Sequence, residues 1–311
     1  MISAKIITTS RSPSGSRLTT FELTYPRMIH AEFMTHRCFS RNAASSRAIP
    51  ITKMLEAVNK NPAMPVYWGA NKSGMQAAEQ LTGTALDDAR DTWRLSAAVA
   101  RQSCRQLDEV GLHKQIANRV LEPFGHITVI ATAEDAGLRN FFGLRAHADA
   151  QPEFQVLAYM MLRLWLETPA EELEYGEWHM PYGIMSEEDR ALDIDTRVKV
   201  ATGRIARVSY LTHDGHRDPD KDIELHDRLL ASGHMSPFEH CAKVVDHHIV
   251  EHWGNFGPGW KQYRKACPNE CRAPTDDELK AKLDAMPQWA SHAILAEDFL
   301  AGQKVEEVAT V

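Results

Sequence analysis

Residues 35–48 have the sequence Thr-His-Arg-Cys-Phe-Ser-Arg-Asn-Ala-Ala-Ser-Ser-Arg-Ala. This stretch contains Arg37, Arg41 and Arg47 and no carboxylate, in a chain whose formal net charge is -7. Guanidinium groups bind phosphate oxygens through paired hydrogen bonds, and serine hydroxyls and loop amides add small donors. The stretch therefore predicts a polar loop suited to a phosphate group, although a solvated surface turn has a similar composition.

Regular elements are predicted on both sides of this loop. Near-alternation of apolar and polar residues predicts strands over 3–9 and 17–25, joined by a turn. Apolar residues at helical spacing predict a long helix over 76–110. Pro152 cannot lie comfortably inside a helix, so a new helix is expected to begin there. A further helix is predicted over 223–231.

Length and composition limit the class of protein. The 311 residues, 43% of them apolar and 25% charged, are enough for one large or two modest globular domains. A pI near 6.1 argues against nucleic-acid binding by bulk electrostatics. The absence of an apolar run of about 18 residues and of a signal-like N-terminus predicts a soluble, cytoplasmic protein with no membrane contact.

Turn residues and cysteines suggest how the chain is organised. We expect one lobe over 1–170, a connection over 171–197 that contains several Pro and Gly residues, and a second lobe over 198–311 with a C-terminal helical tail. The five cysteines are scattered, which favours free thiols in a reducing compartment. Cys267 and Cys271 have no second pair of matched spacing, so no metal site is predicted.

Further candidate site residues lie outside the arginine-containing stretch. Arg119 occurs in Asn-Arg-Val-Leu-Glu-Pro, and Arg145 follows the apolar turn Asn-Phe-Phe-Gly-Leu. A charge beside such a turn needs an anionic partner, which is equally well a structural carboxylate or a ligand. Residues 233–240, Gly-His-Met-Ser-Pro-Phe-Glu-His, place two imidazoles, a hydroxyl and a carboxylate in one turn after a helix, where binding groups are often displayed.

Together these motifs resemble the flavin-dependent thymidylate synthases. Residues 35–48 match the family signature RHRxxSxNExSxRY at His36, Arg37, Ser40, Asn42, Ser45 and Arg47. Residues 119–123, 140–145 and 150–153 are similar to the family's RxVLP, NFxxLR and AQxE segments. Residues 206–210 and 233–240 resemble its ARVSY and GHxSPFEH elements. The resemblance implies an α+β fold with an antiparallel or mixed sheet flanked by long helices.

The order and some residues of the motifs depart from the family pattern. ARVSY and GHxSPFEH follow the NFxxLR segment here, which implies a permuted or partly duplicated arrangement resembling the larger bacteriophage-encoded forms. Residues 260–265 with Asn269 and Glu270 look like a second, degraded copy of residues 28–47. Family residues are replaced at four positions, and Glu270 is a candidate for the missing carboxylate. The replacements are Glu32 for Gln, Thr35 for Arg, Ala43 for Glu and Ala48 for Tyr.

The resemblance also implies an activity and a set of site residues. Family members transfer a one-carbon unit from methylenetetrahydrofolate to C5 of dUMP, using FAD reduced by NADPH, in homo-oligomers with shared active sites, here expected as a dimer or tetramer. By carry-over, Arg145 and Ser45 are the catalytic candidates. The dUMP-binding candidates are Glu32, Ser45, Arg47, Arg119 and Arg145. The FAD-binding candidates are His36, Arg37, Asn140, Ser209, His234, Ser236 and Glu239.

Three alternatives remain open at the level of sequence. The same scaffold could quench its intermediate with water and make 5-hydroxymethyl-dUMP, with room for that water at Thr35 and Ala43. A metal-dependent phosphohydrolase is a second alternative, because His213, His226-Asp227 and Asp246 stand in a plausible order. The lost signature residues also allow a nucleotide-binding protein without catalytic activity.

Overall fold

The computed structural model describes residues 1–77, 79–208, 218–246, 248, 254–268, 270, 273–288 and 290. The chain divides into two compact units, Met1–Glu270 and Cys271–Val311. The second unit contains α10 (Asp276–Asp284), whose first turn is closed by a reciprocal capping box between Thr275 and Glu278. Helices long and apolar enough to cross a membrane are absent from the described part of the chain.

A five-stranded mixed sheet is the centre of the first unit, in the order β3-β4-β2-β1-β5. All neighbours are antiparallel except β1 and β5. The strands predicted over 3–9 and 17–25 are confirmed, as is the α+β class. The bounds are β1 (Ser3–Arg11), β2 (Arg17–Pro26), β3 (Ser40–Ala43), β4 (His126–Glu134) and β5 (Glu171–Glu172).

The short strand β3 corrects the prediction of a continuous polar loop over 35–48. Ser40 to Ala43 pair with Thr132 to Val129 of β4, and Ser40 and Asn42 are buried. Their side chains are polar, so periodicity of apolar residues gives no strand signal here. The backbone is nevertheless paired because β4 presents a free edge at this point.

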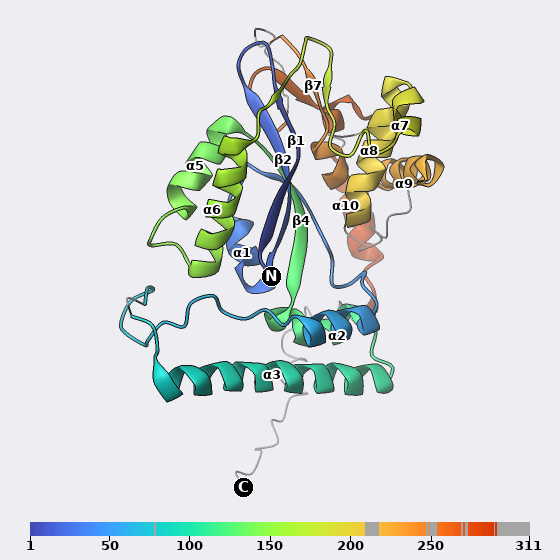
Figure 1. Ribbon diagram of the computed structural model, residues 1–311. Helices are drawn as coiled ribbons and strands as arrows, with labels where there is room; N and C mark the ends of the chain where they lie inside the picture. Colours follow the sequence, from blue (N-terminus) through green and yellow to red (C-terminus); the bar gives the residue numbers. More distant parts are fainter. Residues whose placement is uncertain are drawn as a thin grey trace. The chain divides into compact units, whose positions relative to one another are not determined.

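Two helices, α5 (Asp135–Arg145) and α6 (Pro152–Glu167), cover one face of this sheet (Figure 1). Alternate residues of β2, including Phe21 and Leu23, pack with Phe141 and Phe154 of these helices in one core. The helix α6 begins at Pro152, as predicted. The N–H of the first helical residue has no acceptor within the helix, so proline, which has no N–H, is favoured at this position.

The opposite face carries α8 (Ile194–Val208), against which α9 (Pro219–Ser232) packs (Figure 1). Ile130 of β4 is buried with residues of α8. The two helices approach closely at Gly203, where an added Cβ would lie 2.3 Å from the carbonyl oxygen of Asp222. The predicted helix over 223–231 is part of α9, which ends at the left-handed residue Gly233.

A second, three-stranded antiparallel sheet joins the expected connection to the expected second lobe. It consists of β6 (Trp178–His179), β7 (Ala242–Val244) and β8 (Trp260–Gln262), in that order. The 3-10 turns η3 (Ser236–Glu239) and η4 (Tyr263–Ala266) precede β7 and follow β8. Within Met1–Glu270 the expected lobes therefore pack as one unit.

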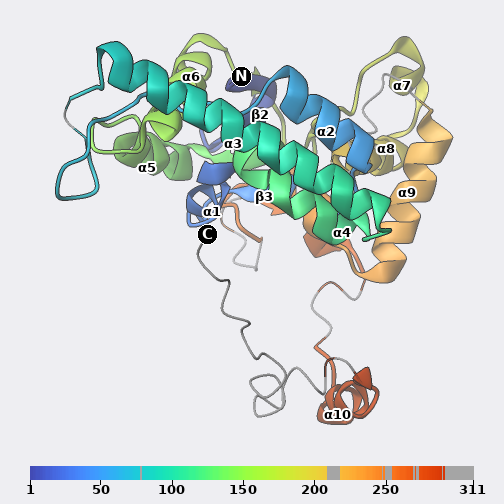
Figure 2. The ribbon, with the colours of Figure 1, turned by 90° about the horizontal axis from the view of Figure 1, so that it is seen from below.

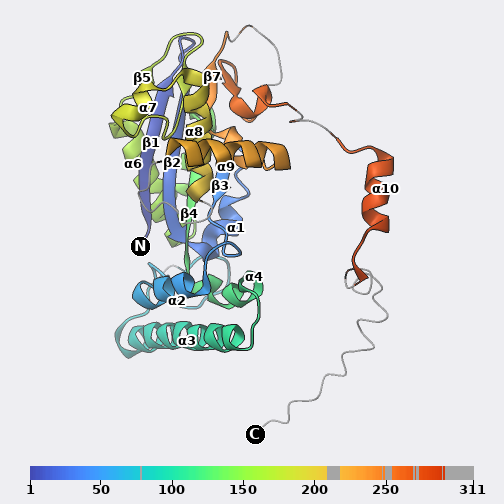
Figure 3. The ribbon, with the colours of Figure 1, turned by 90° about the vertical axis from the view of Figure 1, so that its right-hand side faces the viewer.

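A helical layer lies beyond the end of the main sheet at which β4 begins (Figures 1, 2 and 3). The long helix α3 (Gly83–Glu109) starts later than the predicted residue 76, because Gly69 pairs with Gln80 and Thr82, just before the helix, is extended. Buried Glu153 accepts a hydrogen bond from the Val66 amide at 2.8 Å in the preceding segment. The other elements of the layer are α2 (Ile51–Lys60), α4 (Lys114–Ala117) and η2 (Asn118–Phe124).

A buried chain of hydrogen bonds connects the main sheet to the second sheet. Thr20 Oγ1 is 2.8 Å from His179 Nε2 and 2.7 Å from Thr132 Oγ1, which is 2.8 Å from His240 Nδ1. Burial lowers the pKa of both histidines to about 3, and the nearby His240 adds to the effect on His179. Both rings are therefore neutral at physiological pH.

These two histidines predict a loss of stability in mild acid. The unfolded chain protonates histidine near pH 6.5, whereas the folded chain does so only near pH 3, so the free energy of unfolding falls as pH drops between these values. Each histidine contributes a slope of about 1.4 kcal/mol per pH unit. Urea denaturation from pH 7 to pH 5 should therefore show a shallower slope for His240→Gln than for the parent. His147→Gln, at an exposed position, is the control, and an unchanged slope in His240→Gln would contradict the assignment.

Candidate functional site

Arg145 lies at the C-terminal end of α5 between an acidic and an imidazole partner. Its Nη1 donates to Glu32 Oε1, and its Nε donates to His36 Nε2 at 2.8 Å. The Arg145 side chain is 19% exposed, so most of it is shielded from solvent. The sequence predicted an anionic partner for this arginine, and within the chain Glu32 supplies it.

An aromatic floor supports this group. The guanidinium carbon of Arg145 is 4.7 Å from the centroid of the Phe154 ring, and Phe141 presents its ring edge-on to His36 at 5.0 Å. Phe33 and Phe39 stack beside them with centroids 5.2 Å apart. An arginine fixed over an aromatic ring keeps its planar fork in one orientation, which favours recognition of a flat ligand.

His36 is neutral in this environment. Burial, followed by the positive charges of Arg145 and Arg41, lowers its pKa to about 4. Because Nε2 accepts the hydrogen bond from Arg145, the ring proton belongs on Nδ1. A neutral acceptor leaves the positive charge of Arg145 available to a ligand.

The turn that follows β3 is held by residues from the helical layer. Buried Asn118 donates through Nδ2 to the carbonyl oxygens of Ser46 at 2.7 Å and Ile49 at 2.9 Å. Lys114 Nζ donates to the Ala48 carbonyl oxygen at 3.0 Å. These bonds fix the backbone on both sides of Arg47, whose side chain is exposed, and directly after half-buried Ser45.

Arg119 and Arg145 have different carboxylate partners. Arg119 Nη1 lies 2.9 Å from Glu122 Oε1, and the same oxygen lies 3.1 Å from Arg27 Nη2. Ser46 Oγ, from the turn after β3, donates to this oxygen at 2.6 Å. Glu122 therefore ties Arg119 to the arginine-containing turn.

Residues of α8, η3 and β8 contact the strand β3. Asn42 Nδ2 donates to the carbonyl oxygen of Ile205 in α8 at 2.7 Å, and Ser236 Oγ lies 3.4 Å from Asn42 Oδ1. Gln262 Nε2 bridges Ser40 Oγ at 2.8 Å and the Glu239 carbonyl oxygen at 2.9 Å. Residues separated by almost two hundred positions in the chain thus meet at β3.

The remaining cofactor candidates differ in availability. Arg37, Asn140, His234 and Ser236 are exposed, and His234 Nδ1 lies 2.8 Å from Ser232 Oγ. Glu239 is ion-paired with Arg264. Ser209 lies outside the described residues.

Glu270 has two cationic neighbours within the chain. Its Oε1 lies 2.8 Å from Arg264 Nε and 2.9 Å from Lys265 Nζ. The segment expected to repeat residues 28–47 is here the strand β8 followed by the turn η4. Glu270 therefore belongs to an ion cluster with Glu239, and its role in the nucleotide site stays a prediction.

The donor set fits a flavin nucleotide. A guanidinium at Arg37, an amide at Asn140 and the His234 and Ser236 side chains are exposed donors, and Ser236 lies beside Asn42 of β3. Such groups suit a pyrophosphate and the polar edge of a flavin ring. Glu239, with its charge paired to Arg264, is better suited to positioning the turn than to binding the cofactor directly.

Three residues position the site, and two of them, Asn118 and Gln262, were not singled out from the sequence. Arg41 Nη1 donates to the Met34 carbonyl oxygen at 2.7 Å and closes the turn around His36. Asn118 donates to the carbonyl oxygen of Ser46 in the turn after β3, and Gln262 donates to the hydroxyl of Ser40. A buried amide within a polar segment is a weak sequence signal, because its partners are backbone atoms that become neighbours only after folding.

The residues considered for a metal-dependent hydrolase have other contacts. His226 Nδ1 lies 2.7 Å from Asp227 Oδ1, and His226 Nε2 lies 3.0 Å from the Tyr263 hydroxyl. His213 is outside the described residues. Among the residues that are described, no group of three or more His, Cys, Asp or Glu side chains is arranged to hold a metal ion.

The fold and site define an α+β protein with an arginine-containing polar segment at the edge of a mixed sheet. The family model described as thymidylate synthase complementing protein matches residues 10–169, just over half of the 311 residues. The chain belongs to this family. It is accordingly an enzyme of the pyrimidine C5 methyltransferase type.

Comparisons with individual proteins give distant likenesses. No curated protein matches the chain. Two similar solved structures are of a UMP/dUMP methylase PolB from Streptomyces cacaoi, bound with 5-Br UMP and with 5-Br dUMP. The first has 16% identity and a TM-score of 0.45, and the match covers 54% of this chain and 89% of the other. The second has 16% identity and a TM-score of 0.43, with 54% and 91% covered.

The hydrogen bonds of Asn118 link the helical layer to the turn after β3, and we expect their loss to destabilise both. Asn118→Ala should lower the free energy of unfolding by about 2–4 kcal/mol, because two buried carbonyl oxygens lose their donor. Backbone amides of residues 44–48 should also exchange faster with deuterium. Gln102→Ala, at an exposed position of α3, is the matched control. Unchanged exchange in the turn would show that Asn118 does not hold it.

Proposed function

We propose that this protein transfers a one-carbon unit from methylenetetrahydrofolate to C5 of dUMP, giving dTMP, with FAD reduced by NADPH. The observation that carries the proposal is the contact of Ser236 with Asn42. It joins the turn that bears the flavin candidates His234 and Ser236 to the segment that bears the nucleotide candidates Ser45 and Arg47. Family membership supports the same chemistry.

The pyrimidine ring is assigned to Arg145 and Glu32. Uracil presents an N3–H donor between two carbonyl acceptors, so a guanidinium beside a carboxylate matches one acceptor and the donor. A carboxylate accepts several hydrogen bonds, and Glu32 can therefore keep Arg145 while it binds N3–H. This pairing gives a function to the glutamate that stands where the family commonly has glutamine.

The phosphate of the nucleotide is assigned to Arg47 and Arg119, with Ser45 as a hydroxyl donor. Arg47 and Arg119 are both exposed, so a ligand can reach them. When the nucleotide is absent, Arg119 is ion-paired with Glu122. A phosphate carries more charge than one carboxylate and would compete well for that guanidinium.

The chemical step needs negative charge on the uracil ring to be tolerated while C5 attacks. Arg145 supplies a fixed positive charge for this purpose, and neutral His36 holds Nε of the same guanidinium. The shielding of the group strengthens the interaction relative to water. When bound, FAD would supply reducing equivalents and a stacking surface beside the pyrimidine.

The overall reaction tests the proposal directly. Purified protein supplied with FAD, NADPH, methylenetetrahydrofolate and dUMP should form dTMP, identified by mass. A 5-hydroxymethyl product would instead favour water capture on the same scaffold. Absence of any C5-substituted product, with flavin bound and dUMP affinity intact, would favour a nucleotide-binding protein without activity.

We further propose that the protein forms a homo-oligomer, a dimer or tetramer. Sedimentation of the purified protein measures its oligomeric state.

Arg145→Lys is expected to abolish most turnover while the fold and the flavin spectrum remain intact. Lysine keeps the charge but lacks the planar fork that reaches Glu32, His36 and the ring together. Interactions made mainly in the transition state appear in kcat. Single-turnover oxidation of reduced flavin in the presence of dUMP and methylenetetrahydrofolate measures the effect. A rate near that of the parent would identify Arg145 as a structural ion-pair residue.

Arg47→Ala and Arg119→Ala should each weaken dUMP binding by on the order of 1.5–3 kcal/mol, the usual size of a charged hydrogen bond. The loss should be smaller at high salt because both side chains are exposed. Titration calorimetry with dUMP measures it. Arg163→Gln, whose side chain pairs with Glu167 on the surface of α6, is the control. Parental affinity in either alanine variant would remove that arginine from the site.

A further inference from the structure

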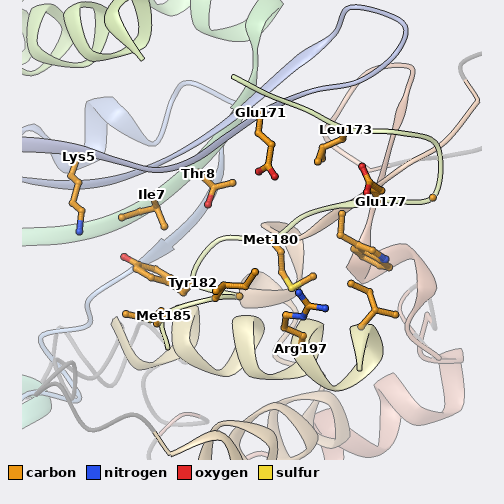
Figure 4. A pocket seen from close by; sticks show the side chains of 15 residues that line it. Lys5, Ile7, Thr8, Glu171, Leu173, Glu177, Met180, Tyr182, Met185 and Arg197 are labelled. Atoms are coloured by element: carbon orange, nitrogen blue, oxygen red, sulfur yellow. The ribbon is translucent and has the colours of Figure 1, made fainter. Parts of the chain in front are cut away.

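The described residues of the first unit enclose a cavity of about 720 Å³ (Figure 4). Its walls come from β1, from residues 171–185 and from the first turn of α8. None of the candidate nucleotide or flavin residues lines it. The volume is in the range of small-molecule sites in proteins.

The strand that forms one wall is irregular at this point. The pairing of β1 with β2 shifts between Ile6 and Thr8, so Ile7 is an extra residue in β1. Lys5, Ile7 and Thr8 line the cavity (Figure 4). A bulge bends its strand and redirects side chains, and bulges are frequent beside binding sites.

The opposite wall holds a backbone conformation that side chains rarely adopt. Tyr182 has a φ of 60°, the only positive φ among the described residues other than glycine. Its hydroxyl donates to Glu22, and its carbonyl oxygen accepts from buried Arg204 at 2.9 Å. Strain that neighbouring groups enforce in this way is concentrated at functional sites.

A guanidinium at the same cavity lacks part of its hydrogen bonding. Arg197 extends from α8 toward Met180 (Figure 4), and its Nε is buried with no hydrogen-bond partner among the residues that the structure describes. Asp193, one turn earlier, accepts from the backbone and the hydroxyl of Thr196 at 2.9 and 2.7 Å. Because a buried donor without an acceptor is costly, an acceptor from a ligand would complete this site.

The remaining lining limits the chemistry of that ligand. Trp178, Met180 and Met185 give apolar walls, and methionine adapts to flat groups of varied shape. Glu171 and Glu177 lie on another side of the cavity from Arg197 (Figure 4). These two carboxylates would repel a ligand that carries several negative charges, so a nucleoside di- or triphosphate fits the cavity poorly.

We propose that this cavity binds a small molecule in which one anionic group is joined to a planar apolar ring, with the anion on Arg197 and the ring between Trp178 and Met180. The strand bulge, the Tyr182 conformation and the unpartnered Arg197 Nε converge on this one place. The proposal is independent of the thymidylate chemistry, because it uses none of the residues assigned to that reaction.

The test uses 2-naphthoate as the probe and the full-length protein labelled with 5-fluorotryptophan. Comparison with Trp178→Phe identifies the ¹⁹F resonance of Trp178. We expect 2-naphthoate to shift that resonance saturably, and Arg197→Gln to weaken the fitted affinity about tenfold or more, the loss expected for a charged hydrogen bond. Arg163→Gln should bind as the parent does, and so should Arg145→Gln.

A second variant and a second probe guard against a folding defect in Arg197→Gln. Ile184→Trp, at an exposed position of the lining, should fill the cavity and weaken 2-naphthoate binding while urea denaturation remains that of the parent. The neutral probe 2-naphthamide should bind more weakly than 2-naphthoate and be insensitive to Arg197→Gln. A Trp178 resonance that does not respond to 2-naphthoate, or equal affinity in the folded Arg197→Gln variant, would overturn the proposal.

Discussion

The pairing of β3 with β4 is the interaction on which the arrangement of the site depends. Ser40 to Ala43 add an edge strand to the sheet. His36 lies just before this strand in the chain, and Ser45 and Arg47 lie just after it. The following helix, α5, starts directly after β4 and brings Arg145 back to His36. One short ladder of backbone hydrogen bonds therefore sets the distance between the arginine turn and the pyrimidine candidate.

Buried polar contacts, together with apolar packing, join the motifs of the two expected lobes. Asn42 bonds to the backbone of α8, and the Thr20, Thr132, His179 and His240 chain links the two sheets. Such networks specify one arrangement because every misplacement leaves a buried group unpaired. The same property makes the arrangement sensitive to acid, since two buried rings resist protonation.

Two arginines of the candidate site, Arg145 and Arg119, are ion-paired within the chain. Glu32 accompanies Arg145 and Glu122 accompanies Arg119 and Arg27. A nucleotide therefore competes with or joins a carboxylate when it binds, which tunes affinity and keeps the arginines oriented in its absence. Arg197 differs from these residues, because part of its guanidinium is buried without a partner among the residues described.

The sequence by itself determined the first two strands and the helix start at Pro152, because these rest on local periodicity and proline geometry. It also indicated the family through its motifs, and that resemblance implied the α+β class. It also indicated that Arg145 needs an anionic partner. Only the tertiary structure decided that this partner is Glu32, that β3 is a strand, and that Ser236 meets Asn42. Those contacts join residues far apart in the chain through backbone pairing and buried hydrogen bonds, and neither leaves a periodic signal in the amino-acid order.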